Sequence, residues 1–294
     1  MNNYRYQLQK YAGMGSKHTC PSCNKKKHFV LYIDTYTNEV VNDNVGRCDG
    51  QIKCGYNYTP MEYFKENGRQ IMNQFYPPNM TTSHISLIDN EILKKSLSEY
   101  QKNSFVKFLG TVFNNQIVDE LTKKYFVGTS HKYYGANVFW QVDIKGNIRT
   151  GKIMLYNEVT GKRVKELSPP ITWAHKALKL ANFNLKQCLY GEHLLKGNNK
   201  PVAIVESEKT AIICSVKLPE FIWLACGGLE NLSSSKCAIL KGRDVTLFPD
   251  LNGYEKWSEK AKNMRFKISA TLEKHANEEE KKMGLDLADF LIKI

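Results

Sequence analysis

Two acidic residues in the last third of the chain have sequence surroundings that are typical of metal ligands. Glu206 follows the apolar run Pro201–Val205, and Asp250 follows the run Val245–Pro249. Continuous apolar runs are typical of buried parallel strands, because both faces of such a sheet are covered. In open α/β sheets, ligands bind beyond the carboxyl ends of the strands. Two strands that bring carboxylates to the same edge therefore predict a site for a hard divalent cation such as Mg²⁺.

A cluster of cysteines near the N-terminus predicts a second, different metal site. Its members are two pairs separated by 24 residues, Cys20 with Cys23 and Cys48 with Cys54. Between the pairs, residues 28–34 alternate as a strand does and residues 42–46 predict a turn, so the pairs flank a hairpin. Four thiolates suit tetrahedral Zn²⁺, which can stabilise a segment too small for its own core. This layout predicts a zinc ribbon, with His18 and His28 as replacement ligands and unmetallated core cysteines as the alternative.

The chain of 294 residues is basic, with 42 Lys and Arg against 29 Asp and Glu, and a net charge of +13. Residues 144–200 hold eleven of the basic residues and three glutamates, which accounts for +8 of that charge. This cluster predicts polyanion binding driven by counterion release, against the ordinary alternative of a solvated surface. No apolar stretch approaches the roughly 20 residues that span a bilayer, and the N-terminus has no apolar signal segment. We therefore expect a cytoplasmic protein with reduced thiols and no membrane partner.

The elements before residue 200 are predicted from caps and periodicity. Thr59 as N-cap and Pro60 as first residue predict a short helix that Gly68 ends. Further predictions are a linker over 69–90, helices around 104–109 and 117–121, and a hairpin of residues 137–143 and 148–156. For Trp173 and His175 we expect a buried tryptophan and a surface histidine, with a base or phosphate contact as the alternative.

Alternating elements continue after residue 200 and predict a parallel α/β sheet for residues 200–294. They are a helix over 208–216, a strand over 221–225, a helix over 253–264 and a strand over 266–270. Asp286 and Asp289 would share one face if their segment is helical. The four cysteines outside the ribbon are expected to be buried apolar side chains, namely Cys188, Cys214, Cys226 and Cys237.

The order of these parts resembles that of a bacterial DNA primase. A Cys-rich ribbon is followed by a Phe-x-x-x-Asp-x-x-Gly-x-Ile hairpin, a Leu-Tyr-Gly step and the acidic strands. The last part is similar to the Toprim domain of primases, topoisomerases and some nucleases and recombination proteins. The likeness covers residues 18–68 and about 100–291, and looks nearest to compact primase-like proteins of Bacteroidetes mobile elements and phages.

This resemblance implies an α/β fold with an α+β N-terminal part. The regions that we expect are a zinc-ribbon domain over 1–68, the linker over 69–90, a basic, mixed α+β primase-type subdomain over 91–199 and a Toprim domain with a parallel α/β sheet over 200–294.

The resemblance also assigns roles to single residues. Glu206 matches the Toprim glutamate, a metal ligand or general acid/base, and Asp250 matches the first aspartate of the family's Asp-x-Asp. Asn252 stands where the second catalytic aspartate is expected, so metal affinity should be lower. Ser207 and Thr210 replace the Gly and Asp of the family's Glu-Gly-x-x-Asp pattern. A third acidic group would then come from Asp286 or Asp289.

The implied function is primer synthesis on single-stranded DNA by metal-dependent nucleotidyl transfer, in the replication of a mobile element or phage. Zn²⁺ and Mg²⁺ (or Mn²⁺) are the implied cofactors, and nucleoside triphosphates and a replicative helicase are further partners. The basic residues expected to contact nucleic acid are Lys145, Arg149, Lys152, Lys162, Arg163 and Lys209. Three alternatives stay open: a DNA-binding replication accessory protein with weakened catalysis, a Toprim nuclease, and a basic α/β domain of unrelated function.

Overall fold

The computed structural model describes residues 5–50, 54–67, 85–167 and 169–292. The chain divides into two compact units, Met1–Ser83 and His84–Ile294. The predicted linker lies outside the described residues as far as position 84. Within the described ranges, no helix has the length and apolar character needed to cross a membrane.

The described residues of the first unit form a four-stranded antiparallel sheet with one α-helix. Its elements are β1 (Tyr6–Leu8), a 3₁₀ turn η1 (Met14–Ser16), β2 (Phe29–Asp34), β3 (Gly46–Cys48), β4 (Asn57–Tyr58) and α1 (Pro60–Glu66), with the strands in the order β1-β2-β3-β4. The helix begins at the predicted N-cap, because Thr59 and Glu62 form a reciprocal capping box. The predicted hairpin is confirmed as β2 paired with β3.

The second unit begins with helices followed by an antiparallel sheet in the order β5-β6-β7-β8. Its elements are α2 (Asn90–Ser96), η2 (Tyr100–Lys102), α3 (Ser104–Val112), α4 (Asn115–Lys124), β5 (Val127–Thr129), β6 (Asn137–Val142), β7 (Ile148–Met154), β8 (Ile171–Trp173) and α5 (Ala174–Ala177). Both predicted helices and the predicted hairpin are confirmed by α3, α4 and the β6–β7 pair.

The prediction for Trp173 and His175 is wrong. His175 is buried, because its Nδ1 lies 2.9 Å from the Thr150 hydroxyl and its ring stacks on Phe183. Trp173 is only half-buried and is the last residue of β8, an edge strand of its sheet. Neither partner of the histidine is near it in sequence, so the local pattern carried no sign of this burial.

A parallel sheet in the order β10-β9-β11-β12 completes the second unit, as predicted for residues 200–294. Its elements are η3 (Glu192–Leu195), β9 (Val202–Val205), α6 (Glu208–Lys217), β10 (Ile222–Ala225), η4 (Leu229–Asn231), α7 (Ser234–Cys237), η5 (Ala238–Leu240), β11 (Val245–Leu247), α8 (Tyr254–Met264), β12 (Lys267–Ile268), α9 (Thr271–His275), α10 (Glu278–Met283) and α11 (Leu287–Ile292). The four cysteines outside the ribbon are buried free thiols, which confirms their prediction.

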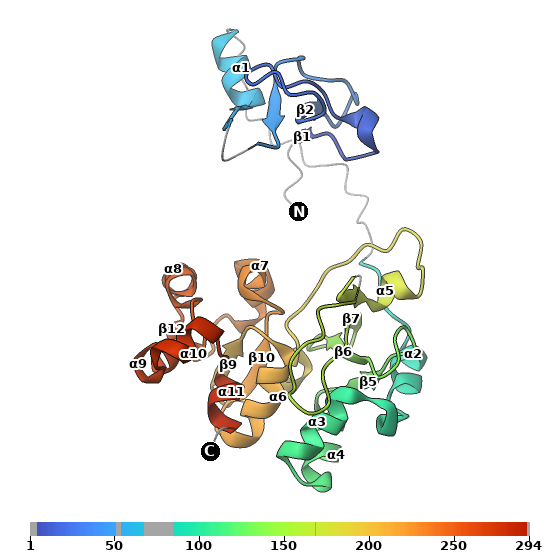
Figure 1. The fold of residues 1–294 in the computed structure, drawn as a ribbon, viewed down its shortest axis with the longest axis vertical. Helices are drawn as coiled ribbons and strands as arrows, with labels where there is room; N and C mark the ends of the chain where they lie inside the picture. The colour runs from blue at the N-terminus through green and yellow to red at the C-terminus, as the bar shows by residue number, and fades with distance from the viewer. Residues whose placement is uncertain (1–4, 51–53, 68–84, 168, 293–294) are drawn as a thin grey trace. The chain divides into compact units, whose positions relative to one another are not determined.

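Both faces of the parallel sheet are covered by helices. Ala203 and Val205 of β9 belong to a core that includes α6 and α11, which pack side by side (Figure 1). Val202 and Ile204 belong to the opposite core, with Trp257 of α8. This arrangement explains why the strand is a continuous apolar run. The core on the α6 face also contains aromatic side chains of α3 and β6, so the two sheets of this unit share one interior.

Candidate functional site

The strand order defines a candidate ligand site between β9 and β11. The chain adds β10 on one side of β9 and then β11 on the other, which is a topological switch point. Ligand sites of open α/β sheets form there, beyond the carboxyl ends of the strands. Glu206 follows β9, and Asp250 follows β11 after two residues. The backbone N–H of Asp250 lies 3.4 Å from Glu206 Oε1, so the two carboxylate residues meet at this edge.

The surroundings of Asp250 disfavour its negative charge. Its Oδ1 is buried and has no hydrogen-bond partner. Burial first, and then the charges of Glu206 and Asp286, raise the pKa of Asp250 to about 9. Burial also raises the pKa of Glu206. Two neighbouring, largely buried carboxylates can both be charged only if a cation lies beside them. The pair therefore fits a hard divalent metal ion whose remaining coordination positions are filled by water or phosphate oxygens.

Gly253 allows the chain to pass close to Glu206. A Cβ at position 253 would lie 2.8 Å from Glu206 Oε1 and 3.1 Å from the carbonyl oxygen of Asp250. The Gly253 N–H donates to that carbonyl at 2.9 Å, which closes the turn after Asp250. Any larger residue at 253 must therefore move the Glu206 carboxylate.

The departures from the Toprim pattern have local structural roles. Asn252 is exposed, takes a left-handed φ of 72°, and its Nδ2 donates to the Lys281 carbonyl at 3.1 Å. The Ser207 hydroxyl accepts the Thr210 N–H at 3.1 Å and caps α6. Their side chains thus anchor α10 and α6, and the catalytic role of Asn252 remains a prediction.

Asp286 and Asp289 reach the same edge through a backbone contact. The Leu251 N–H donates to the Leu285 carbonyl at 3.2 Å, which holds the segment before α11 beside the turn after β11. Both aspartates bind Lys209, with its Nζ 3.0 Å from Asp286 and 2.7 Å from Asp289. These carboxylates therefore have an internal counter-ion.

The basic residues predicted to contact nucleic acid fall into two groups. Arg149 pairs with Asp143 at 2.7 Å, and Lys152 pairs with Glu208 at 3.0 Å, so their charges, like that of Lys209, are already compensated. The exposed members are Lys145, Lys162 and Arg163. Contact with nucleic acid remains a prediction for all six, and the exposed three are better placed for it.

Two lysines at this edge were not identified from the sequence. Lys236 Nζ donates to the Cys226 carbonyl at 3.3 Å, and burial lowers its pKa. Lys260 Nζ donates to the Leu229 carbonyl at 3.3 Å, and its charge opposes the effect of burial on the pKa of Glu206. Lys260 acts on Glu206, whereas the neighbours of Lys236 include Glu208 and Cys226. Nothing in the sequence distinguishes these two helical lysines from others, and only the fold brings them to this edge.

The cysteine cluster forms a second candidate centre. Its sulfur atoms all lie within 4.8 Å of one another, with 3.8 Å between Cys20 and Cys54 and 3.9 Å between Cys23 and Cys48. Sulfurs at the corners of a tetrahedron with bonds of about 2.3 Å are about 3.8 Å apart, so the geometry fits Zn²⁺. In the described part of the chain, this is the single group of three or more potential ligands within such a distance, and neither His18 nor His28 belongs to it.

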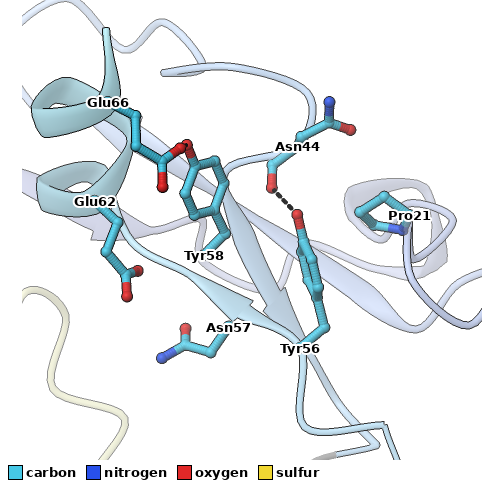
Figure 2. A pocket seen from close by; sticks show the side chains of 7 residues that line it. All are labelled: Pro21, Asn44, Tyr56, Asn57, Tyr58, Glu62 and Glu66. Carbon is cyan, nitrogen blue, oxygen red and sulfur yellow. Dashed lines mark hydrogen bonds between the residues drawn. The ribbon is translucent and has the colours of Figure 1, made fainter. Parts of the chain in front are cut away.

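An open groove of about 540 Å³ lies on the first unit (Figure 2). Its lining residues are Pro21, Asn44, Tyr56, Asn57, Tyr58, Glu62 and Glu66. The Tyr56 hydroxyl donates to the Asn44 carbonyl at 3.0 Å, and the Tyr58 hydroxyl donates to Glu66. The lining combines aromatic rings with two carboxylates, which suits a planar or cationic group better than a phosphate.

Several solved structures share low similarity with this chain. The primase fragment of the bacteriophage T7 primase-helicase is 14% identical, with a TM-score of 0.39 over 91% of this chain and 97% of that chain. The E. coli primase catalytic core is 11% identical, with a TM-score of 0.40 over 69% and 81%. The zinc-binding and RNA polymerase domains of the Aquifex aeolicus primase are 13% identical, with a TM-score of 0.36 over 98% and 83%. Scores this low do not by themselves establish a common fold.

Family comparisons are more definite. No curated protein matches the chain. A model described as a zinc beta-ribbon finger matches residues 4–69, which confirms the predicted ribbon. The model described as a domain of unknown function, DUF6371, matches residues 103–251, which is half of the chain, and the chain therefore belongs to that family.

Proposed function

We propose that this chain is a primase-like nucleotidyltransferase that makes short primers on single-stranded DNA. The observation that carries the proposal is the meeting of Glu206 and Asp250 at the switch point of the parallel sheet, where one oxygen of Asp250 is buried and unpartnered. A bound Mg²⁺ or Mn²⁺ would neutralise triphosphate oxygens there and align the phosphate for attack by a 3′-oxygen. The setting that the resemblance implies is replication of a mobile element or phage, with a replicative helicase as partner.

The residues around the carboxylates suit phosphate chemistry. Lys260 acts on Glu206 through its positive charge and would contribute to holding triphosphate oxygens beside the pair. Glu206 and Asp250 would both hold the metal ion, which compensates the cost of burying their charges. Gly227 and Gly228 follow β10 with φ of 92° and 138°, so the backbone there has no side chain to keep a ligand away.

The template would be bound outside the metal site. Lys145, Lys162 and Arg163 are exposed and belong to the most basic part of the chain. Contacts from these residues would position single-stranded DNA through its phosphates, and the zinc ribbon would add contacts to the same strand.

Primer synthesis by the full chain is the direct test. Single-stranded templates, nucleoside triphosphates and Mg²⁺ or Mn²⁺ should yield short labelled products. Glu206→Gln should abolish them, whereas Asp244→Asn should not, since Asp244 is an exposed carboxylate paired with Lys267. If the wild-type chain makes no product on varied templates with either metal, the proposal is wrong.

A non-catalytic DNA-binding accessory protein is the second candidate. It is favoured by Asn252, whose amide is engaged by Lys281 and brings no charge to the metal site. This candidate predicts DNA binding that weakens steeply with salt, is reduced by Lys162→Glu and is unchanged by Asp250→Asn, without any turnover. The same labelled strands separate a nuclease, which shortens them, from a primase, which extends primers.

A further inference from the structure

Four carboxylates and one ammonium group converge beyond the ends of β9 and β11. The groups belong to Glu206, Asp250, Asp286, Asp289 and Lys209. Their mutual influence is visible at Asp250, where burial and three neighbouring carboxylates raise the pKa and Lys209 opposes the rise. Among the described ion pairs, Lys209 is within contact distance of only two of these four carboxylates, so it matters which two it satisfies.

The two C-terminal aspartates have every carboxylate oxygen engaged. Asp286 Oδ1 accepts the Asp289 N–H at 2.8 Å, and its Oδ2 lies 3.0 Å from Lys209 Nζ. Asp289 Oδ1 accepts from Lys209 Nζ at 2.7 Å, and its Oδ2 lies 3.4 Å from the Asp286 N–H. Asp250 differs, because its Oδ1 has no partner. Among the described ion pairs none involves Glu206 or Asp250, so this side of the cluster has no cation in direct contact, and only the more distant charge of Lys260 acts on Glu206.

Lys209 is held firmly in this position. It lies in the first turn of α6 and is 7% exposed. Burial works against its charge, yet Asp286 and Asp289 raise its pKa overall, so the ammonium group stays protonated. A metal ion bound by these two aspartates would have to displace a buried lysine that has no other carboxylate partner among the described contacts.

We infer that the ammonium group of Lys209 occupies the place of a second divalent cation, so that this edge binds a single metal ion through Glu206 and Asp250. The inference rests on the proposed function, because it concerns the metal content of the same site. Asp286 and Asp289 then position Lys209 and are not metal ligands. The Toprim likeness predicts a third acidic metal ligand, but neither Asp286 nor Asp289 has that role here. Phosphate or water oxygens complete the coordination of the metal ion.

Counting bound Mn²⁺ tests the inference without relying on activity. The zinc-loaded full chain, with its zinc content measured, is titrated with Mn²⁺ while the electron paramagnetic resonance signal of free Mn²⁺ is recorded. We expect one Mn²⁺ per wild-type chain, none in Asp250→Asn, and two in Lys209→Ala, which leaves the aspartate pair without its counter-ion. Lys209→Arg is the matched control, since it keeps the charge and should bind one.

Each other outcome has a distinct meaning. Two ions in the wild type overturn the inference and leave the proposed function intact, whereas no ion in the wild type contradicts the metal site and the proposed function with it. One ion in both the wild type and Lys209→Ala also overturns the inference. If Lys209→Ala does not fold, Asp289→Asn decides, because its carboxylate is 30% exposed and the change is isosteric. It should still bind one Mn²⁺, and loss of that ion would make Asp289 a ligand and the inference wrong.

Discussion

The close contact between Gly253 and Glu206 sets the position of the Glu206 carboxylate. Adding one methyl group at Gly253 tests this contact. In Gly253→Ala the new Cβ would lie 2.8 Å from Glu206 Oε1, the flexible end of that side chain, so the carboxylate should swing away. We expect at least about tenfold weaker Mn²⁺ binding with less than about 1 kcal/mol of lost stability, because the backbone itself is not strained. Calorimetric Mn²⁺ titration and thermal unfolding measure both effects.

Gly110→Ala is the matched control for this change. Gly110 lies in α3, and nothing lies within 4 Å of the Cβ that would be added. This variant should keep its Mn²⁺ affinity and gain up to about 1 kcal/mol of stability, the usual advantage of alanine over glycine in a helix. Equal Mn²⁺ affinity in the two variants would contradict the proposed position of Glu206 in the metal site.

Metal binding should depend on pH through Asp250. With a pKa of about 9, its carboxyl group is protonated near neutrality in the metal-free protein. Because Mn²⁺ must displace that proton, affinity should rise between about pH 6.5 and about pH 8.5, approaching tenfold per pH unit. Apparent dissociation constants across this range check the expectation, and an affinity that does not change would contradict the raised pKa.

The raised pKa of Asp250 has the opposite effect on the stability of the metal-free protein. The unfolded chain releases the Asp250 proton near pH 4 and the folded chain keeps it to about pH 9. Between these values the folded state binds more protons, so this group makes the free energy of unfolding decrease as pH rises. Asp250→Asn should remove that contribution, which denaturant titrations at several pH values would detect.

At the scale of elements, a buried ion pair ties the antiparallel sheet to the parallel one. Lys152 of β7 is 5% exposed and Glu208 of α6 is 1% exposed, and their charged atoms are 3.0 Å apart. Lys152→Met would leave the carboxylate of Glu208 buried without its counter-ion, at a cost of about 3–5 kcal/mol. Urea denaturation should show this loss.

Two comparisons separate the charge effect from lost packing. The double variant Lys152→Met/Glu208→Leu should lie within about 1 kcal/mol of the wild type, since replacing both charges removes the unpaired one. Lys267→Met breaks the exposed pair with Asp244 and should cost less than about 1 kcal/mol. Equal losses in Lys152→Met and the double variant would show that packing of the lysine stem, and not the charge, determines stability.

At the scale of the whole molecule, the two units have separate interiors. Among its described residues, the first unit buries few apolar side chains beyond Phe29, Leu31, Val45, Cys20 and Cys48, whereas the second has extensive cores of its own. So small a core needs a metal to stay folded. Cys48→Ser should therefore remove the zinc, counted by elemental analysis, and unfold the first unit, while the melting of the second unit is unchanged. A single shared transition that shifts as a whole would contradict this independence.

Much of the fold follows from residues that are close together in the chain. The cysteine pairs, the capping box at Thr59 and the apolar runs before Glu206 and Asp250 are local patterns, and the ribbon, α1 and the parallel strands form where these patterns predict them. The resemblance to a primase, both in the parts and in their order, depends on the same local patterns.

The chemistry of the site was decided by tertiary structure. Lys209 and Asp289 are 80 residues apart, and Lys152 and Glu208 are 56 apart, so no local spacing shows that these lysines are paired internally. His175 of α5 is buried for the same kind of reason, through Thr150 of β7. Whether a charged side chain acts as a metal ligand, a counter-ion or a surface contact depends on its neighbours in space. The sequence by itself determined which groups stand at the ends of the strands, and the strand order determined which of them meet.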